Sequence, residues 1–181
     1  MNLSSRKRNF IYLFLILIFS FLIFIYMYSL IPVLEERLER KIIDISTKDL
    51  IDAVYRVVER NLPERDLIIT VLYNPDYRKK LKDNLKIFLS ERLKYIFLIY
   101  KDPSGKYRYL IDTTAKDNSA NLLFMPLKEE ITILDKVLKT KKVHYKIHKE
   151  VSTIGITYYL PVVQGREAKA ILVADFSFEV L

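Results

Sequence analysis

Residues 154–178 read IGITYYLPVVQGREAKAILVADFSF, and this stretch decides the fold. Two runs within it, 154–163 and 168–178, are rich in aliphatic, β-branched and aromatic residues, which predicts two strands. Residues 164–166, Gln-Gly-Arg, separate the runs, and a short break that contains glycine is typical of a hairpin turn. Because strands joined by a tight turn pair antiparallel, this stretch predicts a C-terminal β-hairpin.

The same kind of pattern predicts three more strands upstream. They cover residues 95–100, 107–113 and 143–151. The first two are separated by Asp102-Pro-Ser-Gly105, a turn in which proline presets φ and glycine allows a positive φ. These two strands therefore form a second predicted hairpin.

Helices are predicted over residues 33–62, 75–91 and 128–141. Asn74-Pro75 marks the start of the second helix, with asparagine as the cap and proline at the first helical position. Ser46 and Asp49 either begin a new helix within 33–62 or lie on one long helix. Together these elements predict an α+β fold, a five-stranded antiparallel sheet with helices on its faces and long N-terminal helices.

No charged residue interrupts residues 10–31, FIYLFLILIFSFLIFIYMYSLI. A helix of this length spans about 33 Å, enough to cross a hydrocarbon core of roughly 30 Å. A cleaved signal peptide would have a shorter apolar region and small residues at its cleavage site. The stretch therefore predicts a retained transmembrane helix in contact with membrane lipid.

Basic residues on both sides of this stretch bear on its orientation. A basic cluster lies just before the apolar stretch and consists of Arg6, Lys7 and Arg8. Basic residues are retained on the cytoplasmic side of a membrane. Basic residues also follow it: Arg37, Arg40, Lys41 and Lys48. The tight N-terminal cluster favours a single-pass protein of the inner (cytoplasmic) membrane, with residues 1–9 in the cytoplasm and the domain outside it.

The composition excludes several classes of site. The chain has 181 residues with no cysteine, two histidines and three glycines, which excludes disulfides, thiolate metal sites and glycine-rich phosphate loops. We therefore expect no cofactor, no metal site and no enzymatic activity. The net charge of +8 is dispersed along the chain, whereas nucleic-acid-binding proteins concentrate basic residues in a stripe, so we expect no nucleic-acid partner.

The layout and three segments resemble the single Cache sensor domains, also called PDC or extracytoplasmic PAS-like domains. The segments are the hairpin 95–112, the strand 155–161 and the closing strand 170–177. The resemblance implies a PAS-like sheet and a sensory module of a bacterial histidine kinase, diguanylate cyclase or chemoreceptor, whose output domain lies outside this chain. It divides the chain into segments 1–9, 10–31, 32–62 and 63–181: a basic N-terminus, an anchor, a membrane-proximal helix and a sensor domain.

Alternation along the predicted strands suggests a binding pocket. Side chains two apart share one face of a strand, which groups His144, Lys146 and His148 on one strand and Thr157 and Tyr159 on another. With Arg108 they would form a cationic, hydroxyl-bearing pocket, and arginine suits a carboxylate. The family resemblance implies a small carboxylate or an amino acid as ligand, with Asp175 where amino-acid-binding relatives place an amine-pairing acid.

Structural roles remain open for the same residues. The strand with His144, Lys146 and His148 fits a solvated sheet edge, where charges discourage pairing with other chains. Arg108 suits a salt bridge, and Asp175 suits a pairing role near a strand end.

Two functional hypotheses follow from these observations. The first is an anchored extracytoplasmic sensor that binds a small anion and signals through its N-terminal helix. The second is a ligand-free module for dimerisation or interaction. In both, a homodimer through residues 33–62 is expected.

Overall fold

The computed structural model describes residues 5–116, 120–149 and 153–179, without the side chains of 5–9, 35–40, 42–44 and 46. Two parts of the predictions therefore lie outside the described residues, the loop residues 117–119 and the predicted strand end 150–151. The same holds for the side chains of Arg6, Lys7 and Arg8. The chain divides into two units, Met1–Lys48 and Asp49–Leu181.

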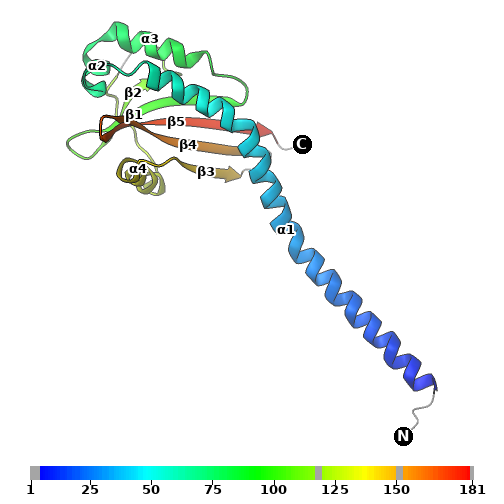
Figure 1. The fold of residues 1–181 in the computed structure, drawn as a ribbon. Coiled ribbons are helices and arrows are strands. Elements are labelled where there is room, and N and C mark those ends of the chain that lie inside the picture. Colours follow the sequence, from blue (N-terminus) through cyan, green and yellow to red (C-terminus); the bar gives the residue numbers. More distant parts are fainter. Residues whose placement is uncertain (1–4, 117–119, 150–152, 180–181) are drawn as a thin grey trace. The chain divides into compact units, whose positions relative to one another are not determined.

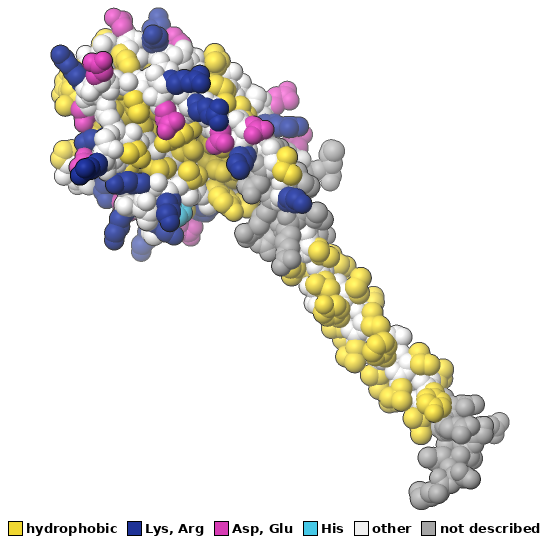
Figure 2. All heavy atoms as spheres, in the orientation of Figure 1, with side chains coloured by type: hydrophobic (Ala, Val, Ile, Leu, Met, Phe, Trp, Pro, Cys, Tyr) yellow, Lys and Arg dark blue, Asp and Glu magenta, His cyan; other side chains and the backbone are white. Residues whose placement is uncertain are grey.

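The first unit consists of the N-terminal part of α1, a single helix over Ser5–Arg60. Ser46 and Asp49 lie inside this helix and begin no second one. Phe10–Leu34 is the one stretch among the described residues that is long and apolar enough to cross a membrane. Its visible face carries hydrophobic side chains without a charged one (Figure 2). The predicted apolar helix is confirmed and extends three residues past its predicted end.

The second unit contains the end of α1, three further helices and a five-stranded antiparallel sheet (Figure 1). The helices are α2 (Leu67–Tyr73), α3 (Pro75–Lys86) and α4 (Lys128–Thr140). The strands are β1 (Leu93–Lys101), β2 (Tyr107–Asp112), β3 (His144–Lys149), β4 (Thr153–Gln164) and β5 (Glu167–Glu179). Their spatial order is β2-β1-β5-β4-β3, which places β5 at the centre. The predicted α+β fold is confirmed.

Side-chain caps start the two short helices that follow α1. Asn74 Oδ1 accepts a hydrogen bond from the Tyr77 N–H at 2.9 Å, and Pro75 is the first residue of α3, as predicted. Asp66 Oδ1 accepts one from the Ile69 N–H at 3.1 Å and starts α2, a helix that the sequence analysis did not assign. α3 ends at Lys86, earlier than predicted, because the backbone then tightens into i to i+3 hydrogen bonds.

Helices cover the two faces of the sheet unequally. The end of α1, α2 and α3 lie on one face, and α4 lies on the other (Figure 1). Tyr55 of α1 donates a hydrogen bond to the Pro161 carbonyl at 2.9 Å, and Val54 and Val58 beside it are fully buried. On the opposite face Leu134 and Val137 of α4 pack on a cluster from the strands: Ile99, Tyr107, Tyr159, Ile171 and Val173.

α4 is too short to cover its face of the sheet. Its 13 residues rise about 20 Å, whereas the 13 residues of β5 extend about 43 Å. The buried cluster under α4 reaches Val173 on β5, and the strand then continues to Glu179. Part of this sheet face therefore lies beyond the helix.

We predict that Leu134→Ala destabilises the domain by about 2–5 kcal/mol, because it leaves a cavity under α4. Ile131→Ala is the matched control, since this isoleucine is 40% exposed on the same helix, and its cost should stay within about 0.5 kcal/mol. Chemical denaturation followed by circular dichroism measures both values. Equal costs would contradict the packing described for α4.

Candidate functional site

The uncovered part of the sheet carries one row of side chains across four strands. Lys146 of β3 pairs with Thr157 of β4, Thr157 pairs with Asp175 of β5, and Asp175 pairs with Tyr95 of β1. Directly opposed residues lie on the same face of a sheet, so these four side chains share the α4 side. The row places a carboxylate on the central strand, where α4 does not cover it.

A cavity of about 580 Å³ lies over this row, and we call it the Asp175 cavity. Residues of β1, α4, β3, β4 and β5 line it: Lys94, Tyr95, Glu130, His148, Thr153, Gly155, Thr157, Asp175, Phe176 and Ser177. Gly155 contributes no side chain to the lining. A Cβ there would meet His148 Cβ and the Phe176 carbonyl oxygen at 3.6 Å, which is ordinary contact.

Thr157 joins Asp175 to His148. Its hydroxyl donates to Asp175 Oδ1 at 2.8 Å, and His148 Nε2 lies 3.2 Å from the same hydroxyl oxygen. A threonine hydroxyl has one proton, so while it donates to the carboxylate it can only accept from the histidine. His148 Nε2 therefore carries a proton in this arrangement. Asp175 Oδ2 has no hydrogen bond within the described part of the chain.

Two carboxylates give the cavity an acidic character. Burial raises the pKa of Asp175, and the negative charge of Glu130 raises it further, whereas the Thr157 hydrogen bond and His148 lower it. Glu130 is held in place because its Oε2 accepts from the Leu127 N–H at 2.8 Å and its Oε1 accepts from the Tyr159 hydroxyl at 3.5 Å. Burial also raises the pKa of Tyr159 well above its usual range, which keeps that hydroxyl protonated.

The structure brings together only some of the predicted site residues. Thr157 and Asp175 line the cavity, and so does His148. Tyr159 lies one row away and reaches the site through its hydroxyl contact with Glu130. Lys146 shares the row, but its Nζ pairs with Glu129 Oε2 at 3.0 Å.

His144 does not line the cavity. It pairs across the strands with Tyr159, next to the cluster under α4. Its Nε2 is buried and has no hydrogen-bond partner within the described residues. Leaving such an atom unpaired costs about 1–3 kcal/mol.

The expectation that Arg108 shares this pocket is wrong. Arg108 pairs with Tyr100 on β1, while the neighbouring Ile99 belongs to the α4-side cluster, so Arg108 lies on the opposite face. Its Nε donates to Asp102 Oδ2 at 2.6 Å and its Nη1 to the Asn121 carbonyl at 3.1 Å. Hydrogen bonds from Ser104 and then Arg108 hold the pKa of Asp102 well below its usual range. The salt-bridge alternative for Arg108 is what the structure shows.

Sequence reasoning missed most of the ten lining residues, and three of these matter for the chemistry of the site. Glu130 was read only as part of a helix, and Gly155 only as part of a strand. Tyr95 was predicted as the first residue of a strand; it is 45% exposed, and its ring stacks on Phe97 with centroids 5.9 Å apart. The cross-strand pairing of Tyr95 with Asp175 depends on register, which a single strand pattern does not reveal.

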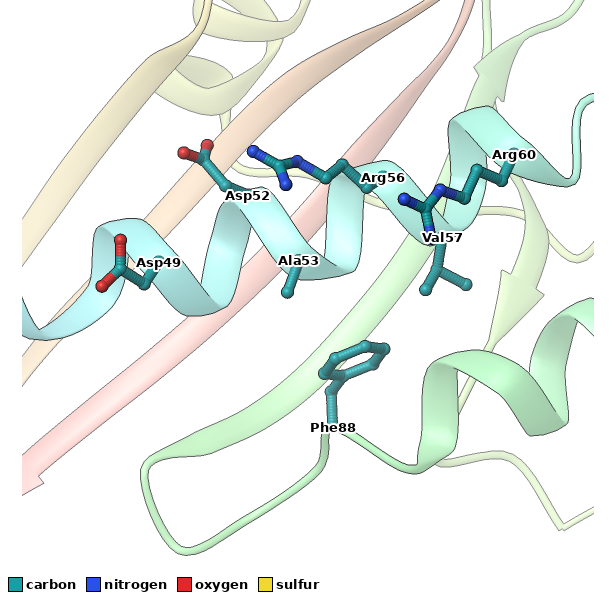
Figure 3. A pocket seen from close by; sticks show the side chains of 7 residues that line it. All are labelled: Asp49, Asp52, Ala53, Arg56, Val57, Arg60 and Phe88. Atoms are coloured by element: carbon teal, nitrogen blue, oxygen red, sulfur yellow. The ribbon is translucent and has the colours of Figure 1, made fainter.

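A second cleft of about 440 Å³ lies along the end of α1 (Figure 3). Ala53 and Val57 point from the helix toward the ring of Phe88, and charged side chains flank them. The charged residues are Asp49, Asp52, Arg56 and Arg60. This cleft combines an apolar floor with charges of both signs and contains no buried acid.

The chain was compared with protein families, curated proteins and solved structures. No protein-family model and no curated protein matches the chain. The chain is similar to the periplasmic domain of RsbU from Chlamydia trachomatis, at 11% identity and a TM-score of 0.38. The match covers 78% of this chain and 55% of the other, so the chain spans about half the length of that structure. This likeness concerns backbone shape alone, and no functional argument follows from it.

We predict that Asp175→Asn flattens the dependence of stability on pH. Because the pKa of Asp175 is raised above 3.8, the folded state binds this proton more tightly than the unfolded state. The resulting stability is complete below the ordinary pKa and is lost as pH rises through the raised one. Melting temperatures from pH 3 to 8, taken by circular dichroism, should therefore fall less in the variant at the upper end.

The control for this experiment is Asp83→Asn, which changes an exposed aspartate on α3. It should leave the pH dependence of the wild type unchanged. If Asp175→Asn kept the pH dependence of the wild type, burial would not raise the pKa of this carboxyl, and the account would be contradicted.

Proposed function

We propose that this chain is a membrane-anchored sensor domain that binds a small molecule in the Asp175 cavity. The observation that carries the proposal is the half-buried Asp175 on the central strand, whose Oδ2 has no partner within the described residues. The cavity over it measures about 580 Å³, which lies within the usual range of about 300–1,000 Å³ for small-molecule sites.

The chemistry of the cavity supports binding over a purely structural role. An ionised carboxylate that is half-buried without a direct ion pair is unfavourable for folding, and burial raises the pKa of Asp175 although His148 opposes this. Asn or an apolar residue at position 175 would spare the domain that cost. A ligand that donates a hydrogen bond to Asp175 and balances its charge would offset this cost. Carboxylates with perturbed pKa values in clefts are often functional for this reason.

The long helix α1 supports a signalling role for such a site. It contains both the apolar stretch Phe10–Leu34 and the first turns of the compact unit, from Asp49 to Arg60. A ligand shifts a conformational equilibrium only through different affinities for its states. We propose that ligand binding in the cavity favours one arrangement of α1, and that residues 33–62 form a homodimer in which this arrangement is read.

The cleft along α1 favours the second candidate, a module for interaction with another chain. Its apolar floor of Ala53, Val57 and Phe88 is flanked by two aspartates and two arginines, a composition that suits a protein surface. This cleft and the Asp175 cavity are lined by different residues, so the two roles are compatible. We propose no reaction for the chain.

The proposed topology places residues 1–9 in the cytoplasm and the compact unit outside it, because Arg6, Lys7 and Arg8 cluster before the span. The chain has no cysteine, so single cysteines can be introduced without background. We predict that Ser104→Cys reacts with an impermeant maleimide on intact cells, whereas Asn2→Cys reacts only after the membrane is opened. The reverse pattern would place the domain in the cytoplasm.

We predict that filling the cavity abolishes ligand binding. The full chain in non-ionic detergent would be screened for thermal stabilisation by small cations, anions and neutral polar solutes. A ligand at a hundred times its Kd stabilises by about 2.7 kcal/mol, which raises the Tm by roughly 5–10 °C. At least one class should do so for the wild type, and Gly155→Leu should remove the shift.

Gly155→Ala adds a methyl group at ordinary contact distances and serves as the milder variant, with a smaller loss of the shift. Arg60→Leu, in the cleft along α1, is the control that leaves the shift unchanged. A screen in which no solute stabilises the chain, or in which Gly155→Leu has no effect, would contradict binding in this cavity.

A further inference from the structure

We infer that the ligand of the Asp175 cavity is an organic cation, an ammonium group that carries alkyl substituents and no carboxylate. This inference rests on the proposed function and adds the chemical class of the ligand. It departs from the carboxylate or amino acid that the sequence predicted. Three features of the cavity carry it: its charge, its lack of partners for an anion and its aromatic wall.

The charges that line the cavity favour a cation. Glu130 and Asp175 contribute two carboxylates, and the basic lining residues are Lys94, which is exposed, and His148, which already lowers the pKa of Asp175. Both oxygens of Glu130 already accept hydrogen bonds, whereas Asp175 Oδ2 accepts none within the described residues. A half-buried carboxylate with a free oxygen is stabilised by an opposite charge within about 4–6 Å.

An anionic ligand would find few partners here. Arg108 lies on the other face of the sheet and pairs with Asp102, and Lys146 pairs with Glu129. The proton on His148 Nε2 points to the Thr157 hydroxyl. A carboxylate in the cavity would therefore depend on one exposed lysine while it faced two carboxylates, which repel it.

The wall of the cavity beside Asp175 is aromatic. Tyr95 is the direct cross-strand partner of Asp175, and its ring stacks on Phe97 at an interplanar angle of 16°. Phe97 in turn meets Tyr109 edge to face at 5.4 Å, and Tyr109 meets Phe124 at 5.1 Å. This series of rings holds Tyr95 in place next to the carboxylate, although its side chain is exposed.

An aromatic face beside an acid suits an alkylated ammonium group. The negative face of a ring attracts a cation that lies within about 6 Å of its centroid. A simple ammonium needs three hydrogen-bond acceptors, and Asp175 Oδ2 is the one carboxylate oxygen of the cavity left without a donor within the described residues. Methyl groups on the nitrogen remove that need and can make apolar contact with Tyr95, which lines the cavity together with Gly155.

The test is calorimetric titration of the full chain in non-ionic detergent with choline and with 3,3-dimethylbutan-1-ol. The alcohol has the shape of choline with carbon in place of the charged nitrogen. We expect choline to bind at least tenfold more tightly than the alcohol. Asp175→Asn should weaken choline at least tenfold, Tyr95→Leu should weaken it severalfold, and Tyr95→Phe should retain it.

Tyr145→Leu is the matched control, because this tyrosine is also exposed, at 47%, but sits on the opposite face of β3. It should bind choline like the wild type. Equal binding of choline and the alcohol, or unchanged affinity in Asp175→Asn, would overturn the inference.

Titrations with acetate, butyrate and glycine separate this inference from the function on which it rests. If one of these binds and choline does not, and Gly155→Leu removes the binding, the ligand class is wrong and the cavity remains a binding site. If no solute of any class binds, the proposed function fails as well.

Discussion

The mismatch in length between α4 and the strands beneath it is the constraint on which the site depends. A helix gains about 1.5 Å per residue and a strand about 3.3 Å, so 13 residues of helix cannot cover 13 residues of strand. Where α4 covers the face, Leu134 and Val137 bury an apolar cluster that ends at Val173 on β5. Two residues further on, the central strand carries Asp175 at the same face. The core and the cavity are thus successive parts of one surface.

The local elements could be predicted because their signals lie in adjacent residues. Asn74-Pro75 starts α3 through a side-chain cap, and each predicted strand corresponds to a strand in the structure. The short helix α2 was not predicted because a seven-residue, mostly apolar run fits a buried strand as well as a helix. The Asp66 cap is the signal that indicates a helix start. The first and last residues of several elements also differ from the predicted ones, because hydrogen bonds of the terminal turns determine where an element ends.

The composition of the site could be predicted only in part because it depends on register between distant strands. Alternation showed that Thr157 and Tyr159 share a face, but it could not show whether Arg108 faces the same way. A bulge between Leu98 and Ile99 shifts the pairing of β1 with β2, and Arg108 ends on the other side. Glu130 reaches the site from a helix, and no pattern within a strand could have indicated it. The sequence therefore predicted a cationic pocket, whereas the cavity in the structure contains two carboxylates.

The central claim is that the carboxyl of Asp175 is held in the cavity at a cost that a bound cation relieves. The most direct measurement is the pKa of this carboxyl, from the pH titration of its carbon-13 resonance with and without choline. The pKa should lie above 3.8 in the free chain and fall when choline is added, because the cation favours the ionised form. An ordinary pKa in the free chain, or one that choline leaves unchanged, would contradict the claim.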